Sequence, residues 1–309
     1  MRNIERSIMD RDFVRLPEAG RFAHVIVRPS VSYWEDVFRR LGTDKVALAS
    51  GVVIAVISAL SVLVPLFCKY DYDATDLLHI NQFPNAQHWF GTDAVGRDLW
   101  ARVWVGARVS LFIGVGGAIV PQLVGIFLGG VSGYFGGWID MLIMRVIDVG
   151  VCIPSLVYVT LIMLFMGSGP TAIIIAIAMT CWMDSARVVR GRMLQFKNRE
   201  FVISARTLGA SSFRIIFRHI LPNILGQQVV SITSAIPTAV FLEAYLSFIG
   251  LGIQSPMTSW GQLCQAGSGY YRLYPYQLFI PGAFISVTIM AFYLFGNCLR
   301  DALDPHLRD

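Results

Sequence analysis

NREFVISARTLGASSFRIIFRHILPN, residues Asn198 to Asn223, lies between two apolar stretches that are each long enough to cross a membrane. The pattern predicts two short helices joined by a turn, and we call this segment the knob. Asn198 is a candidate cap for the first helix, whose apolar residues recur at helical spacing. Gly209 stands where the glycine that ends a helix is expected.

The second half of the knob predicts a second helix, which Ser211 or Ser212 can cap and which Pro222 follows. Basic side chains gather in the knob and just before it: Arg187, Arg190, Arg192, Lys197, Arg199, Arg206, Arg214 and Arg218. Membrane proteins collect such residues on the cytoplasmic side. An ordinary basic loop is one interpretation, but a folded two-helix structure in the cytoplasm predicts a docking surface for a partner protein.

The composition is that of a membrane protein, with 55% hydrophobic and only 15% charged residues. We expect an all-α integral membrane protein with six transmembrane helices. The expected spans are roughly 46–68, 109–131, 141–166, 171–190, 225–249 and 277–297. Towards and just beyond the inner end of the second, Gly125, Gly129 and Gly133 recur every four residues, which predicts close packing against another helix.

Charge sets the expected topology, because the N-terminal 45 residues and the knob are basic. Both termini are expected in the cytoplasm, and the net charge of +5 then reflects topology and does not argue for nucleic-acid binding. The expected parts are a tail 1–45, a first span with an external loop 46–108, a core 109–299 that includes the cytoplasmic loop 191–224, and a tail 300–309. Residues 33–41 are either an amphipathic helix on the inner surface or a plain polar tail.

The knob resembles the Glu-Ala-Ala loop of permease subunits in bacterial ABC importers. Ala205, Gly209 and the Leu221-Pro222 pair match that motif, whereas Ile203 and Ser204 stand where the family has Glu and Ala. In the family this loop docks into a cleft of the ATPase subunit. Carried over, the resemblance implies an ATPase-coupling loop made of Glu200, Ile203, Ser204, Ala205, Arg206, Leu208, Gly209, Ala210 and Pro222. Glu200 lies three residues before Ile203 and is our candidate substitute for the missing carboxylate.

Three further stretches resemble the branch of this family that imports oligopeptides, dipeptides, nickel and glutathione. They are FGTDAVGRDLWARVWVGARVSL at 90–111, GYFGGWID at 133–140 and FLEAYLSFIGLG at 241–252. Within the branch, the chain is most similar to the permease C subunits of oligopeptide transporters. The resemblance covers residues from about Asp36 to the C-terminus.

This resemblance implies a type I ABC importer permease fold in a bacterial inner membrane. It implies a second permease, two ATPase subunits that bind ATP and Mg, and an extracytoplasmic solute-binding protein that delivers oligopeptide. We expect no cofactor in this chain and no enzymatic activity of its own, because it has no Gly-x-x-x-x-Gly-Lys-Ser/Thr motif. Dipeptide, nickel or glutathione import remains an alternative, and an ion-driven transporter, a membrane enzyme or a structural scaffold are rival classes.

Several ionisable residues fall within or beside the expected spans. Glu243, the candidate substrate-path residue, either lines a cavity that meets a peptide's amino terminus or anchors its helix to a partner subunit. Arg145 with Asp148, and Asp184 with Arg187, have the spacing to pair along one helix.

The expected external loop carries a second group of ionisable residues, namely His79, His88, Asp93 and Asp98. These residues lack the spacing of metal ligands, and the aspartates stand in turn-forming company. We therefore expect a hydrogen-bonded turn and no metal site.

Overall fold

The computed structural model describes residues 33–303, and every regular element among them is helical, as expected for an all-α protein. The chain divides into two units, Met1–Arg39 and Arg40–Asp309. Helix α3 (Tyr33–Thr43) crosses that boundary, so of the two alternatives for residues 33–41 the structure has the helix. Most of the expected N-terminal tail and residues 304–309 lie outside the described residues.

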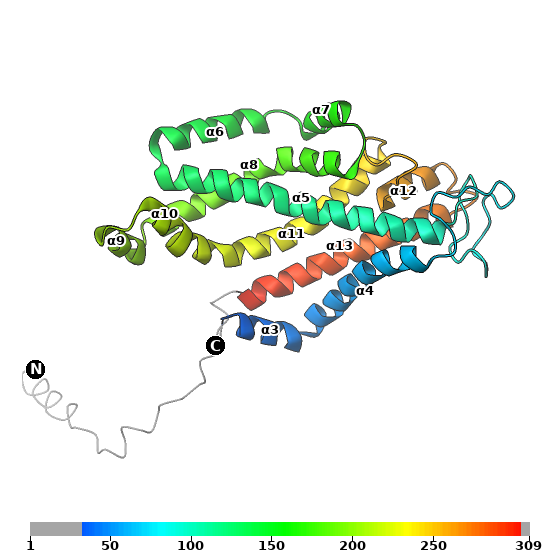
Figure 1. Ribbon diagram of the computed structural model, residues 1–309, viewed down its shortest axis with the longest axis horizontal. Coiled ribbons are helices and arrows are strands. Elements are labelled where there is room, and N and C mark those ends of the chain that lie inside the picture. Colours follow the sequence, from blue (N-terminus) through cyan, green and yellow to red (C-terminus); the bar gives the residue numbers. More distant parts are fainter. Residues whose placement is uncertain (1–32, 304–309) are drawn as a thin grey trace, which may run out of the picture. The chain divides into compact units, whose positions relative to one another are not determined.

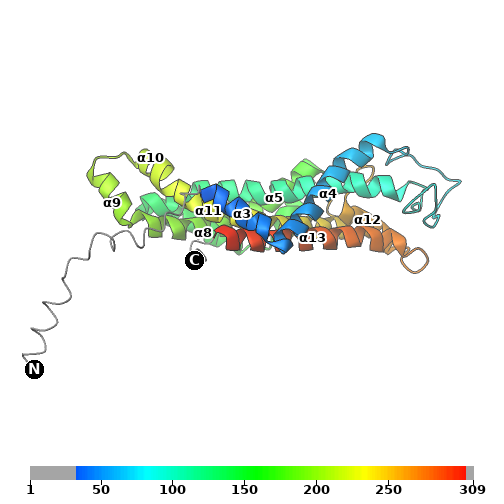
Figure 2. The same cartoon turned by 90° about the horizontal axis from the view of Figure 1, so that it is seen from below.

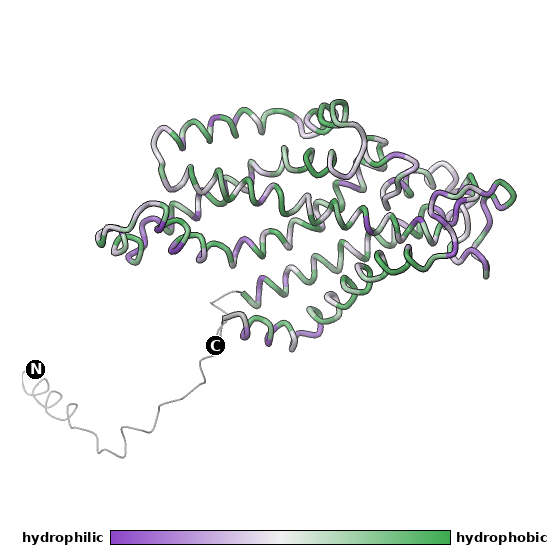
Figure 3. Tube along the Cα trace, viewed as in Figure 1, coloured by the Kyte–Doolittle hydropathy of each residue, from purple (hydrophilic) through white to green (hydrophobic). Residues whose placement is uncertain are grey.

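Within residues 33–303, five helices are long and apolar enough to cross a bilayer. They are α4 (Lys45–Phe67), α5 (Leu99–Phe135), α8 (Pro170–Lys197), the continuous run Ser212–Phe248 and α13 (Tyr276–Leu303). The green tube of Figure 3 follows these helices, whereas purple hydrophilic residues gather in the connections. The expected spans at 46–68, 109–131, 171–190, 225–249 and 277–297 each fall within one of these helices or within a residue or two of its ends.

The expected third span, 141–166, is not one straight helix. Helices α6 (Gly137–Val151) and α7 (Ser155–Met166) meet at an angle of 89°. Pro154 lies at the break; proline lacks an N–H and disfavours a helical conformation in the residue before it. The chain has six candidate spans only if this bent pair counts as one.

The second long helix, α5, begins ten residues earlier than the expected span at 109. Asp98 caps it, because its Oδ1 accepts a hydrogen bond from the Ala101 amide at 2.8 Å. The non-helical part of the expected external loop therefore ends at Asp98, and residues 99–108 are helical and continuous with the expected span.

Close packing between α5 and α8 confirms the glycine pattern. A Cβ on Gly133 would lie 2.7 Å from Cβ of Met193 and 2.8 Å from the Arg190 carbonyl oxygen, so only glycine fits. Gly129 and Gly125 in the same way touch the α8 backbone around Ala186. The two helices consequently lie side by side along much of α5 (Figure 1).

Two small structures stand at opposite ends of the second unit in both views (Figures 1 and 2). At one end is the knob, built from α9 (Glu200–Thr207), α10 (Ser212–Arg214), the π-helix η1 (Ile215–Ile220) and the start of α11 (Leu221–Phe248). At the other end is what we call the platform, which comprises the loop 69–98 and α12 (Trp260–Ser268).

The platform is held to the long helices by buried groups. The Trp260 side chain is completely buried, and its indole N–H donates to the Val103 carbonyl at 3.0 Å. The Tyr276 hydroxyl donates to the Gln82 carbonyl at 2.8 Å, and the Gln277 amide donates to Asn81 Oδ1 at 2.8 Å. Loop, α12 and α13 therefore form one packed end.

Candidate functional site

The knob has the two-helix form that its sequence predicts, with one cap in a different place. Helix α8 continues to Lys197, so Asn198 ends that helix. The prediction that Asn198 caps the next helix is therefore wrong; Arg199 occupies the cap position of α9 without a side-chain hydrogen bond. Gly209 ends α9 with φ +80°, a left-handed conformation that glycine adopts at little cost, as predicted.

The second helix of the knob begins as predicted and does not end where predicted. Ser211 caps it, accepting a hydrogen bond from the Arg214 amide at 3.4 Å. The helix then runs through Pro222 into the membrane-length α11. Pro222 has no N–H to donate and stands two residues after the end of the π-helix. In that π-helix each hydrogen bond spans five residues, one more than in an α-helix.

A buried apolar cluster holds the knob together. Val202, on α9, is completely buried against Ile215 and Ile220 of the second helix. Tyr134 of α5 and Met193 of α8 belong to the same cluster. The inner face of α9 thus packs on helices that cross the membrane.

The outer face of the knob is exposed, and it carries the residues expected in an ATPase-coupling loop. Exposed members are Glu200, Ile203, Ser204, Arg206, Leu208, Gly209 and Pro222, whereas Ala205 and Ala210 are half-buried. The Glu200 carboxylate makes no ion pair within the described part of the chain, while the Ser204 hydroxyl donates to the Glu200 carbonyl at 2.8 Å. Most of these residues are therefore accessible at the surface of the knob.

That surface is apolar and basic at once. Leu208 is 88% exposed and Phe213 is 71% exposed. The rings of Phe213 and Phe217 lie 4.3 Å apart, and exposed arginines, among them Arg214, flank them. Contiguous exposed apolar groups with a polar rim are typical of a protein-interaction site.

A set of polar contacts that sequence reasoning missed joins the base of the knob to the neighbouring helices. Arg190 of α8 donates two hydrogen bonds, of 2.5 and 2.6 Å, to the Asp140 carboxylate of α6, and the Ser132 hydroxyl also donates to Asp140. Lys197 Nζ donates to the Tyr134 carbonyl at 2.5 Å. The aspartate of the glycine-rich turn at 133–140 was the available signal, but its partner lies fifty residues further along the chain.

Glu243 lies in α11 at the platform end, completely buried within this chain. Its carboxylate accepts hydrogen bonds from Ser110 of α5 at 2.8 Å and from Ser247 at 2.9 Å. Ser110 also accepts the backbone N–H of Trp260 at 3.2 Å. In this structure Glu243 therefore connects α5, α11 and α12.

The ionisable residues of α6 and α8 pair across the helices and not along them. Arg187 donates to Asp148 at 3.0 Å, so the expected Arg145–Asp148 and Asp184–Arg187 pairs are wrong. The reason is that α6 and α8 pack against each other, which brings the Asp148 carboxylate of α6 within hydrogen-bond distance of Arg187 of α8.

The platform loop is organised by ion pairs, as expected for a hydrogen-bonded turn. Asp93 pairs with Arg97 at 2.8 Å and with the buried Arg102 at 3.4 Å, and His88 Nδ1 lies 2.8 Å from Asp98. Nowhere in residues 33–303 do three His, Cys, Asp or Glu side chains meet as metal ligands would.

Asp76, in the same loop, forms a hydrogen bond with His79. Asp76 accepts a 2.7 Å hydrogen bond from His79, and this bond, with a second from the Leu78 amide, lowers the pKa of the Asp76 carboxyl from its ordinary value. The contact steadies an exposed turn.

Two known protein families match this chain. A family described as binding-protein-dependent transport system inner membrane component matches residues 125–309. A second family, described as the N-terminal TM domain of oligopeptide transport permease C, matches residues 32–84.

Individual proteins align along nearly the whole chain. The oligopeptide transport system permease protein OppC of Bacillus subtilis is 41% identical over 308 residues, covering 100% of both chains. The dipeptide transport system permease protein DppC of the same organism is 44% identical over 306 residues, covering 97% of this chain and 94% of its own. OppC of Escherichia coli K12 is 40% identical over 276 residues, covering 89% of this chain and 91% of its own.

Among solved structures, a chain of the MetNI methionine ABC transporter, in inward-facing conformations, aligns with a TM-score of 0.50. It covers 66% of this chain and 97% of its own length at 17% identity, and so it informs on the fold alone.

Proposed function

Because this chain belongs to the family of binding-protein-dependent transport system inner membrane components, we propose that it passes the motion of separate ATPase subunits to a peptide path through its knob. It is a multi-pass inner-membrane protein with the type I importer permease fold. It is a permease subunit of a peptide importer and not itself an enzyme. The observation that carries the proposal is the exposed apolar and basic surface around Leu208 and Phe213.

The knob lies in the cytoplasm in this proposal, and the platform lies outside. The basic residues of the knob favour the cytoplasm by the charge rule for membrane proteins. In Figure 1, α4 begins and α13 ends on the side of the unit that carries the knob. The two termini would then also lie inside.

Docking transmits force because the knob is continuous with the membrane helices. An ATPase subunit that holds the outer face of α9 would push through Val202 on Ile215 and Ile220. The helix that carries Ile215 and Ile220 runs unbroken into α11, and α8 leads directly into the knob from the other side. Movement of the knob therefore tilts two spans, which is the two-state element that coupling requires. ATP and Mg would be bound by the ATPase subunits.

A second permease completes the path. The cavity that the described residues enclose between α5, α8 and α11 has a volume of about 120 Å³. Sites for drug-sized ligands have volumes of about 300–1,000 Å³. A peptide path therefore needs a second permease wall, and an extracytoplasmic solute-binding protein would deliver the peptide to the platform side.

Oligopeptide is the cargo we propose, because OppC proteins align over up to the full chain. Dipeptide is the second candidate, which the 44% identity to DppC favours. Nickel and glutathione are carried by the same branch, and direct uptake assays separate all four cargoes.

Purification from the native membrane in mild detergent tests this function. The expected complex contains a second permease and two ATPase subunits, and its ATP hydrolysis in liposomes rises with peptide-loaded binding protein. A Leu208→Glu variant should lose the ATPase subunits from the complex, whereas Leu273→Glu, at a 70% exposed leucine of the opposite end, should keep them. A wild-type chain that purifies alone and moves solute along an ion gradient would contradict the proposal.

A further inference from the structure

One face of α11 is polar, although the helix crosses the membrane. Gln227, Ser231, Ser234 and Thr238 follow one another at intervals of four, three and four residues, which places them on one face of the helix. We call this face the polar stripe. Gln227 and Thr238 are exposed, and the two serines are half-buried.

Lipid is an unfavourable neighbour for such a face. Polar side chains within membrane helices generally face the bundle interior or a water-filled cavity. The exposed side of α4 has the opposite character, with Val52, Val56 and Leu63 about half exposed. Lipid suits that apolar side, and the polar stripe of α11 needs water, a partner or a substrate.

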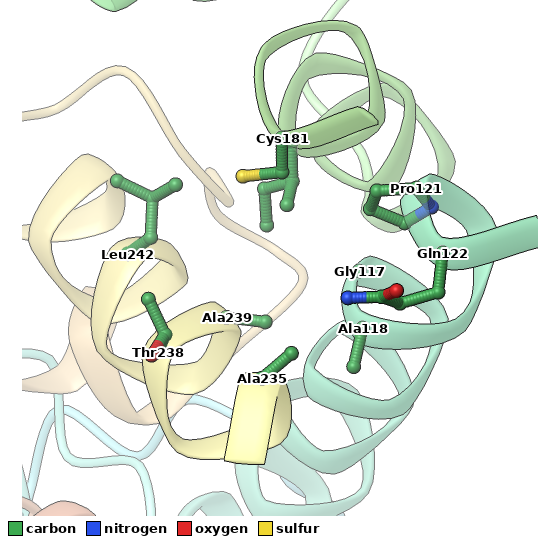
Figure 4. A pocket seen from close by; sticks show the side chains of 10 residues that line it. Gly117, Ala118, Pro121, Gln122, Cys181, Ala235, Thr238, Ala239 and Leu242 are labelled. Atoms are coloured by element: carbon green, nitrogen blue, oxygen red, sulfur yellow. The ribbon is translucent and has the colours of Figure 1, made fainter. Parts of the chain in front are cut away.

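A cavity opens beside Thr238, between α5, α8 and α11 (Figure 4). It is lined mainly by small and apolar residues: Gly117, Ala118, Pro121, Ile177, Ala235, Ala239 and Leu242, with Gln122, Cys181 and Thr238 as the other members. Its volume of about 120 Å³ corresponds to a few water molecules of about 30 Å³ each or to one side chain.

Gln122 offers the cavity an unused donor. The Ser185 hydroxyl donates to Gln122 Oε1 at 2.7 Å, which fixes the orientation of the amide. The amide nitrogen then points into the cavity (Figure 4) and has no hydrogen-bond partner in the described part of the chain. The cavity thus combines a free amide donor with Thr238, the one residue of the polar stripe among its lining residues.

Both groups are neutral and match a peptide backbone. A carboxamide and a hydroxyl can donate to backbone carbonyls, and the hydroxyl can also accept from backbone N–H groups. Glu243 does not contribute to this wall, since its carboxyl group is completely buried and hydrogen-bonded to Ser110 and Ser247. Among the described residues, one cation contacts the polar stripe: Arg300 donates to Ser234, in the middle of the stripe, at 3.5 Å.

We propose that the polar stripe of α11, together with Gln122 of α5, is this chain's wall of the translocation path and contacts the peptide backbone through neutral hydrogen-bonding groups. The proposal rests on the proposed function and deepens it. Such a wall holds a peptide irrespective of its side-chain charges, so the path itself does not discriminate among charged cargoes.

Cysteine accessibility in the full importer tests the location of the path. In a chain whose five native cysteines are replaced, Thr238→Cys is compared with Val56→Cys, a matched substitution in the middle of α4. Both complexes are reconstituted in liposomes and treated with a trimethylammonium methanethiosulfonate reagent. Thr238→Cys should react at least about tenfold faster and should then lose peptide uptake. Equal rates would overturn the proposal.

Ser231→Cys, two turns away on the polar stripe, gives the same test if Thr238→Cys does not assemble. If either cysteine reacts fast but the importer carries no peptide, the result supports the location of the path and contradicts only the peptide cargo.

The neutral character of the wall has its own test. Thr238→Val keeps the shape of the side chain and removes the hydroxyl. Uptake of tripeptides with a central Lys, Glu or Ala should fall by the same factor, several-fold in each case. A loss confined to one charge class would overturn the backbone-contact assignment.

Discussion

The platform and the knob occupy opposite ends of the same helices and are stabilised in different ways. At the platform, side chains distant in sequence meet through buried hydrogen bonds, such as Tyr276 to Gln82 and Trp260 to Val103. At the knob, every side-chain hydrogen bond within the described residues 198–223 is local, and α9 is held mainly by the packing of Val202.

The difference assigns different tasks to the two ends. Segments with few buried contacts open and move at low free-energy cost, whereas segments with many do not. The platform is therefore suited to hold a fixed shape for an incoming binding protein. The knob is suited to be moved by a partner, provided that the partner grips its exposed apolar side chains.

The largest effect is expected from removing the centre of the platform. Trp260→Ala deletes a completely buried indole and its hydrogen bond to Val103. It should cost about 3–5 kcal/mol of stability. Thermal unfolding of the purified chain in detergent measures the loss. The same substitution at Trp138, which is 69% exposed, is the control, and equal losses at both positions would contradict the rigid platform.

A smaller effect on stability but a severe one on transport is expected at the turn of the knob. Gly209 has φ +80°, and a Cβ on this residue would meet no atom within 4 Å, so Gly209→Val fails only through backbone strain. That strain costs roughly 1–2 kcal/mol. The variant should insert and assemble its platform normally while peptide uptake collapses.

Gly209→Asn provides the matched control, because asparagine tolerates the left-handed conformation. It should retain most of the uptake that Gly209→Val loses. Normal uptake by Gly209→Val itself would remove the knob from the coupling mechanism.

Glu200→Gln should change coupling without changing stability, since the carboxylate is exposed and has no ion-pair partner in the described chain. We expect unchanged thermal unfolding and several-fold more ATP hydrolysed per peptide imported. The ratio of the two rates in liposomes is the measurement. An unchanged ratio would exclude Glu200 as the substitute for the missing motif carboxylate.

The smallest effect is expected in the platform loop. The hydrogen bond from His79 is the main cause of the lowered pKa of the Asp76 carboxyl, so this contact stabilises the turn above the ordinary pKa and is lost as the pH falls through the lowered one. In a His79→Ala variant, the Asp76 pKa measured by carbon NMR should rise toward its ordinary value. His219→Ala, in the knob, should leave it unchanged; a shift there as well would contradict the local origin.

Sequence reasoning succeeded where the signal is local. Gly209 and Ser211 mark a turn and a cap by their residue types alone, and the glycines of α5 recur at a helical interval. It failed where the partner is remote: Glu243 meets Ser110 across 133 positions and Asp140 meets Arg190 across 50. The bend at Pro154 was also missed, because an apolar stretch of sequence has the same composition whether it forms one straight helix or two helices at an angle.

Two leucines provide the most direct test of the central claim that the knob, and not the platform, receives the ATPase. Leu208 of the knob is 88% exposed and Leu78 of the platform is 89% exposed, so a photo-crosslinking amino acid at either position is equally accessible. In intact cells, position 208 should yield adducts with an ATPase subunit, and position 78 should yield none. ATPase adducts from position 78, with none from position 208, would contradict both the topology and the coupling role.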